Sequence, residues 1–251
     1  IGLVLYLGSC IIKVLNKLHI KTMKKLLGII LLLSSTLSYG LFGLFSEAVC
    51  VDEIKIQERN KMFFQVNVVQ PFTGSMCAYY ISGQKKIEVN IEDGKKDGAS
   101  TTWYENGQKK LERYYEYGKK DGKSIQWYED GQIDFERNYK NNKEDGKSVK
   151  WHENGQIAGE VNFKDGEKDG KWTNWHDNGQ IKLKAYFKNG QEDGRLTRWH
   201  ENGQQKQEIN YKDGKEDGVY KSWNKNGQQI LEANYKDGKE DGVYKSWNKN
   251  G

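Results

Sequence analysis

The sequence predicts an all-β protein, an elongated single-layer twisted antiparallel sheet made of tandem 24-residue β-hairpins. Tryptophan recurs every 24 residues, with Asp-Gly six and five residues before it and Asn-Gly or Asp-Gly after it. The seven copies are Trp103, Trp127, Trp151, Trp175, Trp199, Trp223 and Trp247. Hydrophobic residues make up only 35% of the chain. That share is too small for one thick core, but it suffices for an array in which each repeat covers only its neighbours.

Each repeat contains the pattern of two strands. We count positions from the Trp, which is position 0. Positions +8, +10 and +12 are mostly apolar, as in Leu231, Ala233 and Tyr235, and a charged residue such as Glu232 separates them at +9. This alternation is typical of a half-buried strand. A shorter strand precedes the Trp, and the glycines on both sides mark turns, so each repeat is expected to form one hairpin.

The turn after the Trp is predicted to be a three-residue Glu-Asn-Gly loop with a left-handed Gly. This loop would place the Trp opposite position +6, and position −2 opposite +8. Trp199 would then share a face of the sheet with Tyr211, and all the apolar residues would come together. If the two strands paired in a register shifted by one residue, the apolar residues would no longer lie together on one face of the sheet.

The chain divides into four predicted segments. Residues 1–22 are interpreted as upstream translation or as an error of the gene model, with the true start at Met23. Residues 23–48 have a basic start, a short apolar run and small residues, which is the layout of a signal peptide. A membrane anchor is the alternative, and whether the leader is cleaved stays open. Residues 49–70 form a transition, and residues 71–251 carry about eight repeats, the first with Tyr79 in the Trp place and the last incomplete.

Several kinds of site are not expected. Acidic and basic residues are interleaved in every repeat, so the net charge of +5 forms no patch suited to nucleic acid. The histidines His152, His176 and His200 lie one repeat apart, about 10 Å, which is too far for a shared metal. Turn chemistry explains the Asp-Gly pairs without calcium. No phosphate-binding loop or nucleophile elbow is present, so we expect no metal, no cofactor and no catalytic residue.

Two cysteines, Cys50 and Cys77, follow the predicted leader. In an oxidising compartment they would pair and close the front of the array. Two free thiols are an equal alternative. The expected location is the periplasm, the cell envelope or the medium, because the leader predicts export from a bacterial cell.

The motif Asp-Gly-x4-Trp-Tyr-Glu-Asn-Gly-Gln, followed by Tyr-Lys-Asp-Gly, resembles the bacterial MORN-repeat variant and the YwqK-type antitoxin family built from it. The resemblance covers about residues 71–251. It implies an open meander of hairpins that binds a partner protein without catalysis, and it implies a toxin as one kind of partner. The expected function is therefore antitoxin-like or immunity-like protein binding. The alternative is a structural or scaffold protein associated with the membrane or the cell wall.

The aromatic stripe of the array has two interpretations. It is either the core of the repeats themselves or, because a single-layer sheet leaves it partly exposed, a surface that binds a partner. Trp and Tyr are favoured anchors at protein interfaces. The predicted partner-binding residues are Trp103, Trp127, Trp151, Trp175, Trp199, Trp223, Tyr139, Phe163, Phe187 and Tyr211.

Overall fold

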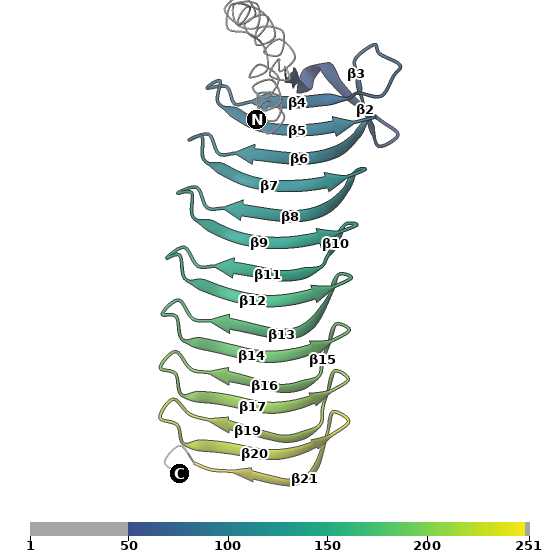
Figure 1. Ribbon diagram of the computed structural model, residues 1–251. Coiled ribbons are helices and arrows are strands. Elements are labelled where there is room, and N and C mark those ends of the chain that lie inside the picture. Colours follow the sequence, from purple (N-terminus) through teal and green to yellow (C-terminus); the bar gives the residue numbers. More distant parts are fainter. Residues whose placement is uncertain (1–49, 249–251) are drawn as a thin grey trace, which may run out of the picture. The chain divides into compact units, whose positions relative to one another are not determined.

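The computed structural model describes residues 50–248, so the predicted segments 1–22 and 23–48 lie outside the described residues. The described part forms a 19-stranded sheet and a separate two-stranded hairpin, with one 3-10 turn, η1 (Glu53–Lys55). No helix in this part of the chain is long and apolar enough to span a membrane. The predicted all-β class is confirmed. Figure 1 shows the strands stacked in the order of the sequence.

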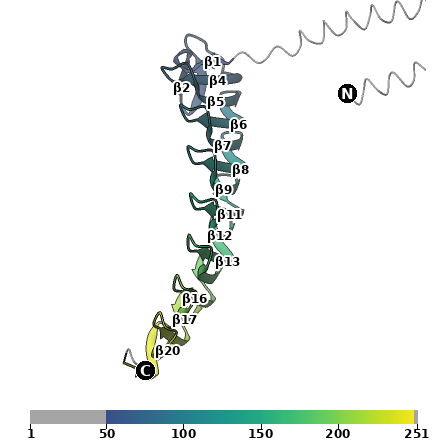
Figure 2. The same cartoon turned by 90° about the vertical axis from the view of Figure 1, so that its left-hand side faces the viewer.

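Seven hairpins follow one another along the sheet, and each strand pairs antiparallel with its neighbours in sequence. They are β4–β5 (Gly74–Tyr79, Lys85–Glu92), β6–β7 (Lys95–Trp103, Lys109–Glu116), β8–β9 (Lys119–Trp127, Ile133–Lys140), β11–β12 (Gly146–Trp151, Ile157–Lys164), β13–β14 (Glu167–Trp175, Ile181–Lys188), β16–β17 (Gly194–Trp199, Gln205–Lys212) and β19–β20 (Gly218–Trp223, Gln229–Lys236). Strand β21 (Lys239–Ser246) pairs with β20, and the short strands are β10 (Lys143–Glu144), β15 (Gln191–Glu192) and β18 (Lys215–Glu216). Figure 2 shows that these strands form a single twisted layer.

The predicted transition segment is an ordered cap on the first hairpin. Strand β1 (Val51–Asp52) pairs parallel with β4, and a disulfide joins Cys50 to Cys77 across a Cα–Cα distance of 5.6 Å. The hairpin of β2 (Ile56–Arg59) and β3 (Met62–Gln65) follows. Phe72 and Val89 form a small core here with Ile91. The cap therefore covers the apolar side of β5.

The predicted three-residue loop is confirmed. In the repeat of Trp199, the His200 N–H donates to the Gln204 carbonyl, and the Gly203 N–H donates to the His200 carbonyl, both at 2.9 Å. Gly203 has a φ of 82°, which glycine adopts without steric cost. Trp199 lies opposite Gln205, which is position +6.

The predicted face of the Trp, however, is wrong. The register shifts directly after this pair, because Arg198 lies opposite Gln207 and leaves Lys206 as an extra residue. Leu196 consequently lies opposite Ile209, and position −2 faces +9 rather than +8. Side chains alternate along a strand, so Trp199 lies on the face opposite to Leu196 and Tyr211. The sheet thus has a Trp face, with positions 0, −2, +6 and +9, and a Tyr/Phe face, with positions −3, −1, +8, +10 and +12.

The opposite edge of the sheet is formed by a second kind of turn. Tyr211 lies opposite Glu216, and the two-residue loop between their strands, Asp213-Gly214, has φ angles of 49° and 76°. Those angles are typical of a type I′ turn. This geometry places position −7 of each repeat, here Glu216, beside position +12 of the repeat before it. The two positions share the Tyr/Phe face.

Candidate partner-binding surface

The structure does not bring the ten predicted partner-binding residues onto one surface. The six tryptophans lie on the Trp face, whereas Tyr139, Phe163, Phe187 and Tyr211 lie on the Tyr/Phe face. All ten side chains are half-buried. The extra residue at position +7 separates the two sets, and the spacing of the aromatic residues alone does not reveal it.

Lysine side chains lie over several rings of the Trp face. The Nζ atoms of Lys85, Lys109 and Lys184 lie 5.5, 5.7 and 5.8 Å from the ring centroids of Trp103, Trp127 and Trp199, respectively. Lys109 also forms an ion pair of 2.7 Å with the +9 residue, Glu112. Cation–π contacts and ion pairs thus hold these tryptophans within the repeat array. On this face, the contacts favour the interpretation that the tryptophans belong to the packing of the repeats themselves rather than to a partner-binding surface.

The Tyr/Phe face has a central row made of positions −3 and +10, which lie opposite one another on successive strands. After the first hairpin, where Met76 and Val89 are apolar, the row is polar in the N-terminal half of the array and apolar in the C-terminal half. The polar residues are Ser100, Arg113, Ser124, Arg137 and Ser148, and the apolar ones are Val161, Trp172, Ala185, Leu196, Ile209 and Tyr220. Leu196 and Ile209 are 1% and 0% exposed. The C-terminal half therefore has a continuous apolar core on one side of a single sheet.

Aromatic residues border the buried cluster of Leu183, Ala185, Leu196 and Ile209 in this part of the face. Trp172, Phe187, Tyr211 and Tyr220 pack against the buried cluster. The rings of Trp172 and Phe187 lie 5.7 Å apart. Burial, followed by the carboxylates of the −7 residues on either side, raises the pKa of the Tyr211 phenol. The half-buried rings offer apolar area with polar edges, which suits contact with another protein.

Position +1, which is Tyr in three successive repeats and His in the next three, connects neighbouring repeats. Its side chain bonds to the Trp carbonyl of the next repeat at 2.8–3.2 Å in six successive copies. These copies are Tyr80, Tyr104, Tyr128, His152, His176 and His200. Burial, and then the neighbouring carboxylate of Asp134, raises the pKa of Tyr128 to about 12. The histidines therefore have a structural role. The sequence excluded a shared metal for them but did not predict this bond between repeats, although their shared position with Tyr was a signal for it.

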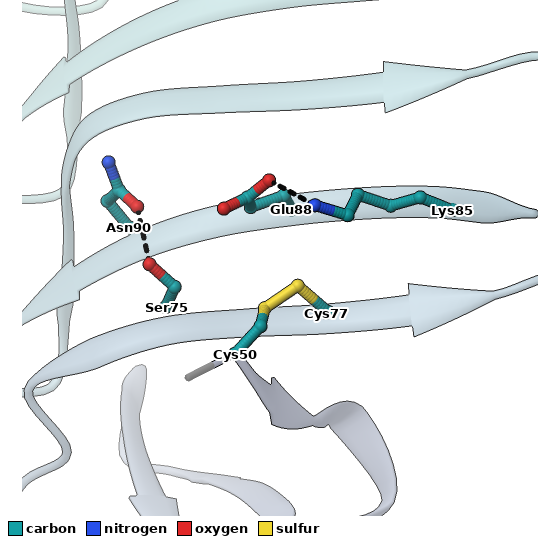
Figure 3. The surroundings of a disulfide bond; sticks show 6 residues. All are labelled: Cys50, Ser75, Cys77, Lys85, Glu88 and Asn90. Carbon is teal, nitrogen blue, oxygen red and sulfur yellow. Dashed lines mark hydrogen bonds and ion pairs between the residues drawn. A yellow bond between two sulfur atoms is a disulfide. The ribbon is translucent and has the colours of Figure 1, made fainter. Parts of the chain in front are cut away.

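The sulfur atoms of Cys50 and Cys77 lie close to the carboxylate of Glu88. Figure 3 shows the two sulfur atoms joined in a disulfide, while Glu88 bonds to Lys85 at 2.9 Å. Disulfide sulfur has no thiolate to offer a metal ion. This cluster is therefore a structural junction between the cap and the first repeat.

Comparison with known protein families agrees with the repeat geometry. The family model described as MORN repeat variant matches residues 96–117, 120–141, 144–165, 168–189, 192–213 and 216–237, which together make up more than half of the chain. No curated protein matches. A solved structure titled "Crystal Structure of TcdB2-TccC3-Cdc42" is similar at 11% identity and a TM-score of 0.19, over 64% of this chain and 13% of that chain.

The chain thus spans about an eighth of the length of that structure's chain, and so low a TM-score supports no argument about fold or function. The family match is of a different kind, because each matched segment runs from position −7 to position +14 of one repeat. Every segment therefore includes both strands of one hairpin and the Glu-Asn-Gly type of loop. The chain belongs to the MORN repeat variant family.

Proposed function

We propose that this chain is a non-enzymatic protein-binding module that holds its partner on the Tyr/Phe face. Repeats of this family commonly serve as protein-binding modules. The observation that supports the proposal most directly is the half-buried aromatic border of Trp172, Phe187, Tyr211 and Tyr220 around the apolar core. Contiguous apolar area on one side of a sheet is typical of an interaction site.

The Trp face is the weaker candidate. Lysines lie over rings on both faces, since Lys168 lies 4.0 Å from the ring centroid of Trp172. The Trp face in addition has rows of charged residues that pair across strands, as in Lys123–Glu136 at 2.9 Å and Lys147–Glu160 at 2.7 Å. A partner would have to displace these contacts before it reached a ring. Charged residues are also depleted at the core of protein interfaces.

We extend the proposal to an antitoxin-like or immunity-like role in an exported protein. The resemblance of the repeat to the YwqK-type family supports the antitoxin-like or immunity-like role. The disulfide between Cys50 and Cys77 supports export, because disulfides persist mainly in oxidising compartments. Under this proposal the partner is a toxin encountered outside the cytosol.

A pull-down of the tagged full chain from native cell-envelope extract, followed by mass spectrometry, tests the proposal. We expect one stoichiometric partner that is lost in the double variant Phe163→Ala/Phe187→Ala. The matched control is Trp151→Ala/Trp175→Ala in the same two repeats on the other face, which should retain the partner. Circular dichroism must show that both variants are folded. Equal retention by both variants would contradict binding on the Tyr/Phe face.

The alternative, an envelope-associated structural or scaffold protein, gives a different result in the same experiment. The chain would be recovered in the membrane or cell-wall fraction without a stoichiometric partner. That outcome would remove the antitoxin role. The predicted leader in residues 23–48, outside the described residues, is what favours this alternative.

A further inference from the structure

Two successive repeats place an Arg at +10 and a Tyr at +12 on the Tyr/Phe face. In the second of them, the pair Arg137 and Tyr139 binds a carboxylate that belongs to the chain itself. The Nη1 atom of Arg137 lies 2.8 Å from Oε1 of Glu144, and the Tyr139 hydroxyl lies 3.3 Å from the same oxygen. Glu144 occupies position −7 of the following repeat, opposite Tyr139. This geometry is a built example of carboxylate recognition on this face.

The first pair, Arg113 and Tyr115, has the same arrangement without the acid. The residue opposite Tyr115 is Lys120 instead of a glutamate. Its Nζ lies 4.9 Å from the ring of Tyr139. Among residues 50–248, no side chain forms a hydrogen bond or an ion pair with Arg113, and its Nε is buried without a partner. An arginine in such a position normally meets an oxyanion, because a half-buried guanidinium gains most from charge-assisted hydrogen bonds.

A pocket lies beside this arginine. Ser124 is directly opposite both Arg113 and Arg137 on the neighbouring strands. Its small side chain leaves a pocket of about 70 Å³. The lining residues are Leu111, Arg113, Ser124, Gln126, Phe135, Arg137 and Tyr139. Large residues such as Trp172 and Leu196 occupy the equivalent position −3 in the C-terminal half, so this pocket is a feature of the polar half of the row.

The charges around the pocket are mainly positive. Lys96 lies over the ring of Tyr115, with 5.3 Å between its Nζ and the ring centroid, and Lys120 lies on the other side. Neither forms an ion pair with a described carboxylate. The nearby acids already have partners. Glu144 binds Arg137, and Asp134 accepts a hydrogen bond of 2.9 Å from Gln126.

At the turns beside the pocket, two further acids are also engaged. Asp97 accepts a hydrogen bond from the backbone N–H of Tyr117, and Asp121 accepts one from that of Asn141. These carboxylates hold the turns of successive repeats together. They leave the cationic groups of the pocket available for an external anion.

We infer that the pocket between Arg113 and Arg137 receives an aspartate or glutamate side chain of the protein partner. The inference rests on the proposed function, because it assumes that the partner covers the Tyr/Phe face. The guanidinium of Arg113 matches the geometry of a carboxylate, and arginine is enriched among the residues that dominate interface binding energy. The partner would supply at Arg113 the group that Glu144 supplies at Arg137.

The test uses the full chain and a fluorescein-labelled peptide of alternating Glu and Ser residues, with the corresponding Gln–Ser peptide as the reference. We expect the Glu peptide to bind, and Arg113→Gln to raise its Kd at least about tenfold. The substitution Lys120→Glu should have the same effect, because it places a carboxylate of the chain where Glu144 lies in the next repeat. That variant should also unfold at a higher temperature, since Arg113 then gains an ion pair.

The matched control is Lys171→Glu, which makes the same change of charge on the exposed Trp face of β13. Its Kd for the Glu peptide should stay within about twofold of the unmodified chain's. An equal loss of binding in Lys171→Glu would reduce the effect to overall charge and overturn the inference. Equal binding of the Gln–Ser peptide, or an unchanged Kd in Arg113→Gln, would also overturn it.

A phosphoserine peptide of the same length separates the two oxyanion chemistries. Binding at least about tenfold tighter than that of the Glu peptide would assign the pocket to phosphate and overturn the carboxylate assignment. The peptide assay needs no native partner, so its result is independent of the pull-down. A failed pull-down with a positive peptide result would reject the proposed function and keep the pocket. The reverse combination would keep the function and reject the pocket.

Discussion

The two halves of the Tyr/Phe face differ in chemistry but not in backbone. In the N-terminal half the central row runs through Ser100, Arg113 and Ser124, whereas in the C-terminal half it runs through Trp172 and Leu196. The buried core is confined to the second half and to the cap at the start of the array. Both halves nevertheless form the same hairpins with the same register shift beside the Trp. The residues of the central row therefore do not determine the register of the hairpins.

The edges of the sheet hold the register instead. At position +3, Asn106 donates to the Glu129 carbonyl of the next repeat at 2.9 Å, and Asn178 donates to that of Glu201 at 2.8 Å. The same asparagines accept a hydrogen bond from the Gln backbone in their own loop. Together with the bonds from position +1, these contacts connect the turns of adjacent repeats in both halves. A polar or an apolar central row can then be accommodated on one scaffold, as expected for arrays stabilised between neighbours.

The largest difference between the halves should appear when the central row is truncated. We expect Leu196→Ala to lower the free energy of unfolding by about 2–5 kcal/mol, because it leaves a cavity in the apolar half. Ser148→Ala should be neutral or slightly stabilising, since the Ser148 hydroxyl is buried without a partner. Guanidinium denaturation followed by circular dichroism measures both. Equal losses in the two variants would show that the halves do not differ in packing.

The cap should matter most to the half that lacks a continuous apolar row. We expect the double variant Cys50→Ser/Cys77→Ser to destabilise the N-terminal repeats by about 2–4 kcal/mol, because the disulfide limits the unfolded chain. Hydrogen exchange followed by mass spectrometry would locate the loss in β4 to β7. Adding dithiothreitol should reproduce the loss in the unmodified chain and change the variant no further. An effect spread evenly over all repeats would contradict this division.

Position +1 tests whether the edge contacts are equivalent in the two halves. His176→Tyr should leave stability unchanged, because Tyr104 and Tyr128 make the same bond to the next Trp carbonyl. His176→Phe should cost about 1 kcal/mol, because it removes the hydrogen bond and keeps the ring. Thermal unfolding distinguishes the two. A loss with His176→Tyr as large as with His176→Phe would point to a specific need for imidazole.

The smallest expected effect is a loss of stability at alkaline pH. The fold raises the pKa of Tyr128 from its ordinary value of 10.0 to about 12, so it favours the protonated phenol. This contribution is complete below pH 10.0 and is lost as the pH rises through about 12. Tyr128→His, which copies position +1 of the C-terminal half, should weaken this dependence. Unfolding free energies above and below pH 10.0 would measure it, and an identical profile in the variant would contradict the assignment.

Much of the fold could be predicted from the sequence. The period of the Trp, the Asn-Gly loops and the alternation from +8 to +12 predicted the hairpins, and Glu201-Asn-Gly203 forms the predicted loop. The candidate surface was predicted less well. Its residues were chosen on the assumption of one aromatic face, and the structure divides them between two. The role of His176 and the unpaired Arg113 were both missed, since each depends on a residue in the adjacent repeat.

The sequence by itself therefore determined the repeat, the order of the hairpins and the three-residue loop after the Trp, because these depend on residues close together in one 24-residue unit. Only the tertiary structure decided which face each side chain occupies. One unpaired residue in the second strand, such as Lys206, places the Trp on the face opposite to Tyr211. The hydrophobic pattern of the sequence does not indicate where this extra residue lies. The contacts between repeats were decided at the same level. Arg137 binds Glu144, which occupies position −7 of the following repeat, opposite Tyr139. Arg113 lacks such a carboxylate because the equivalent residue, opposite Tyr115, is Lys120.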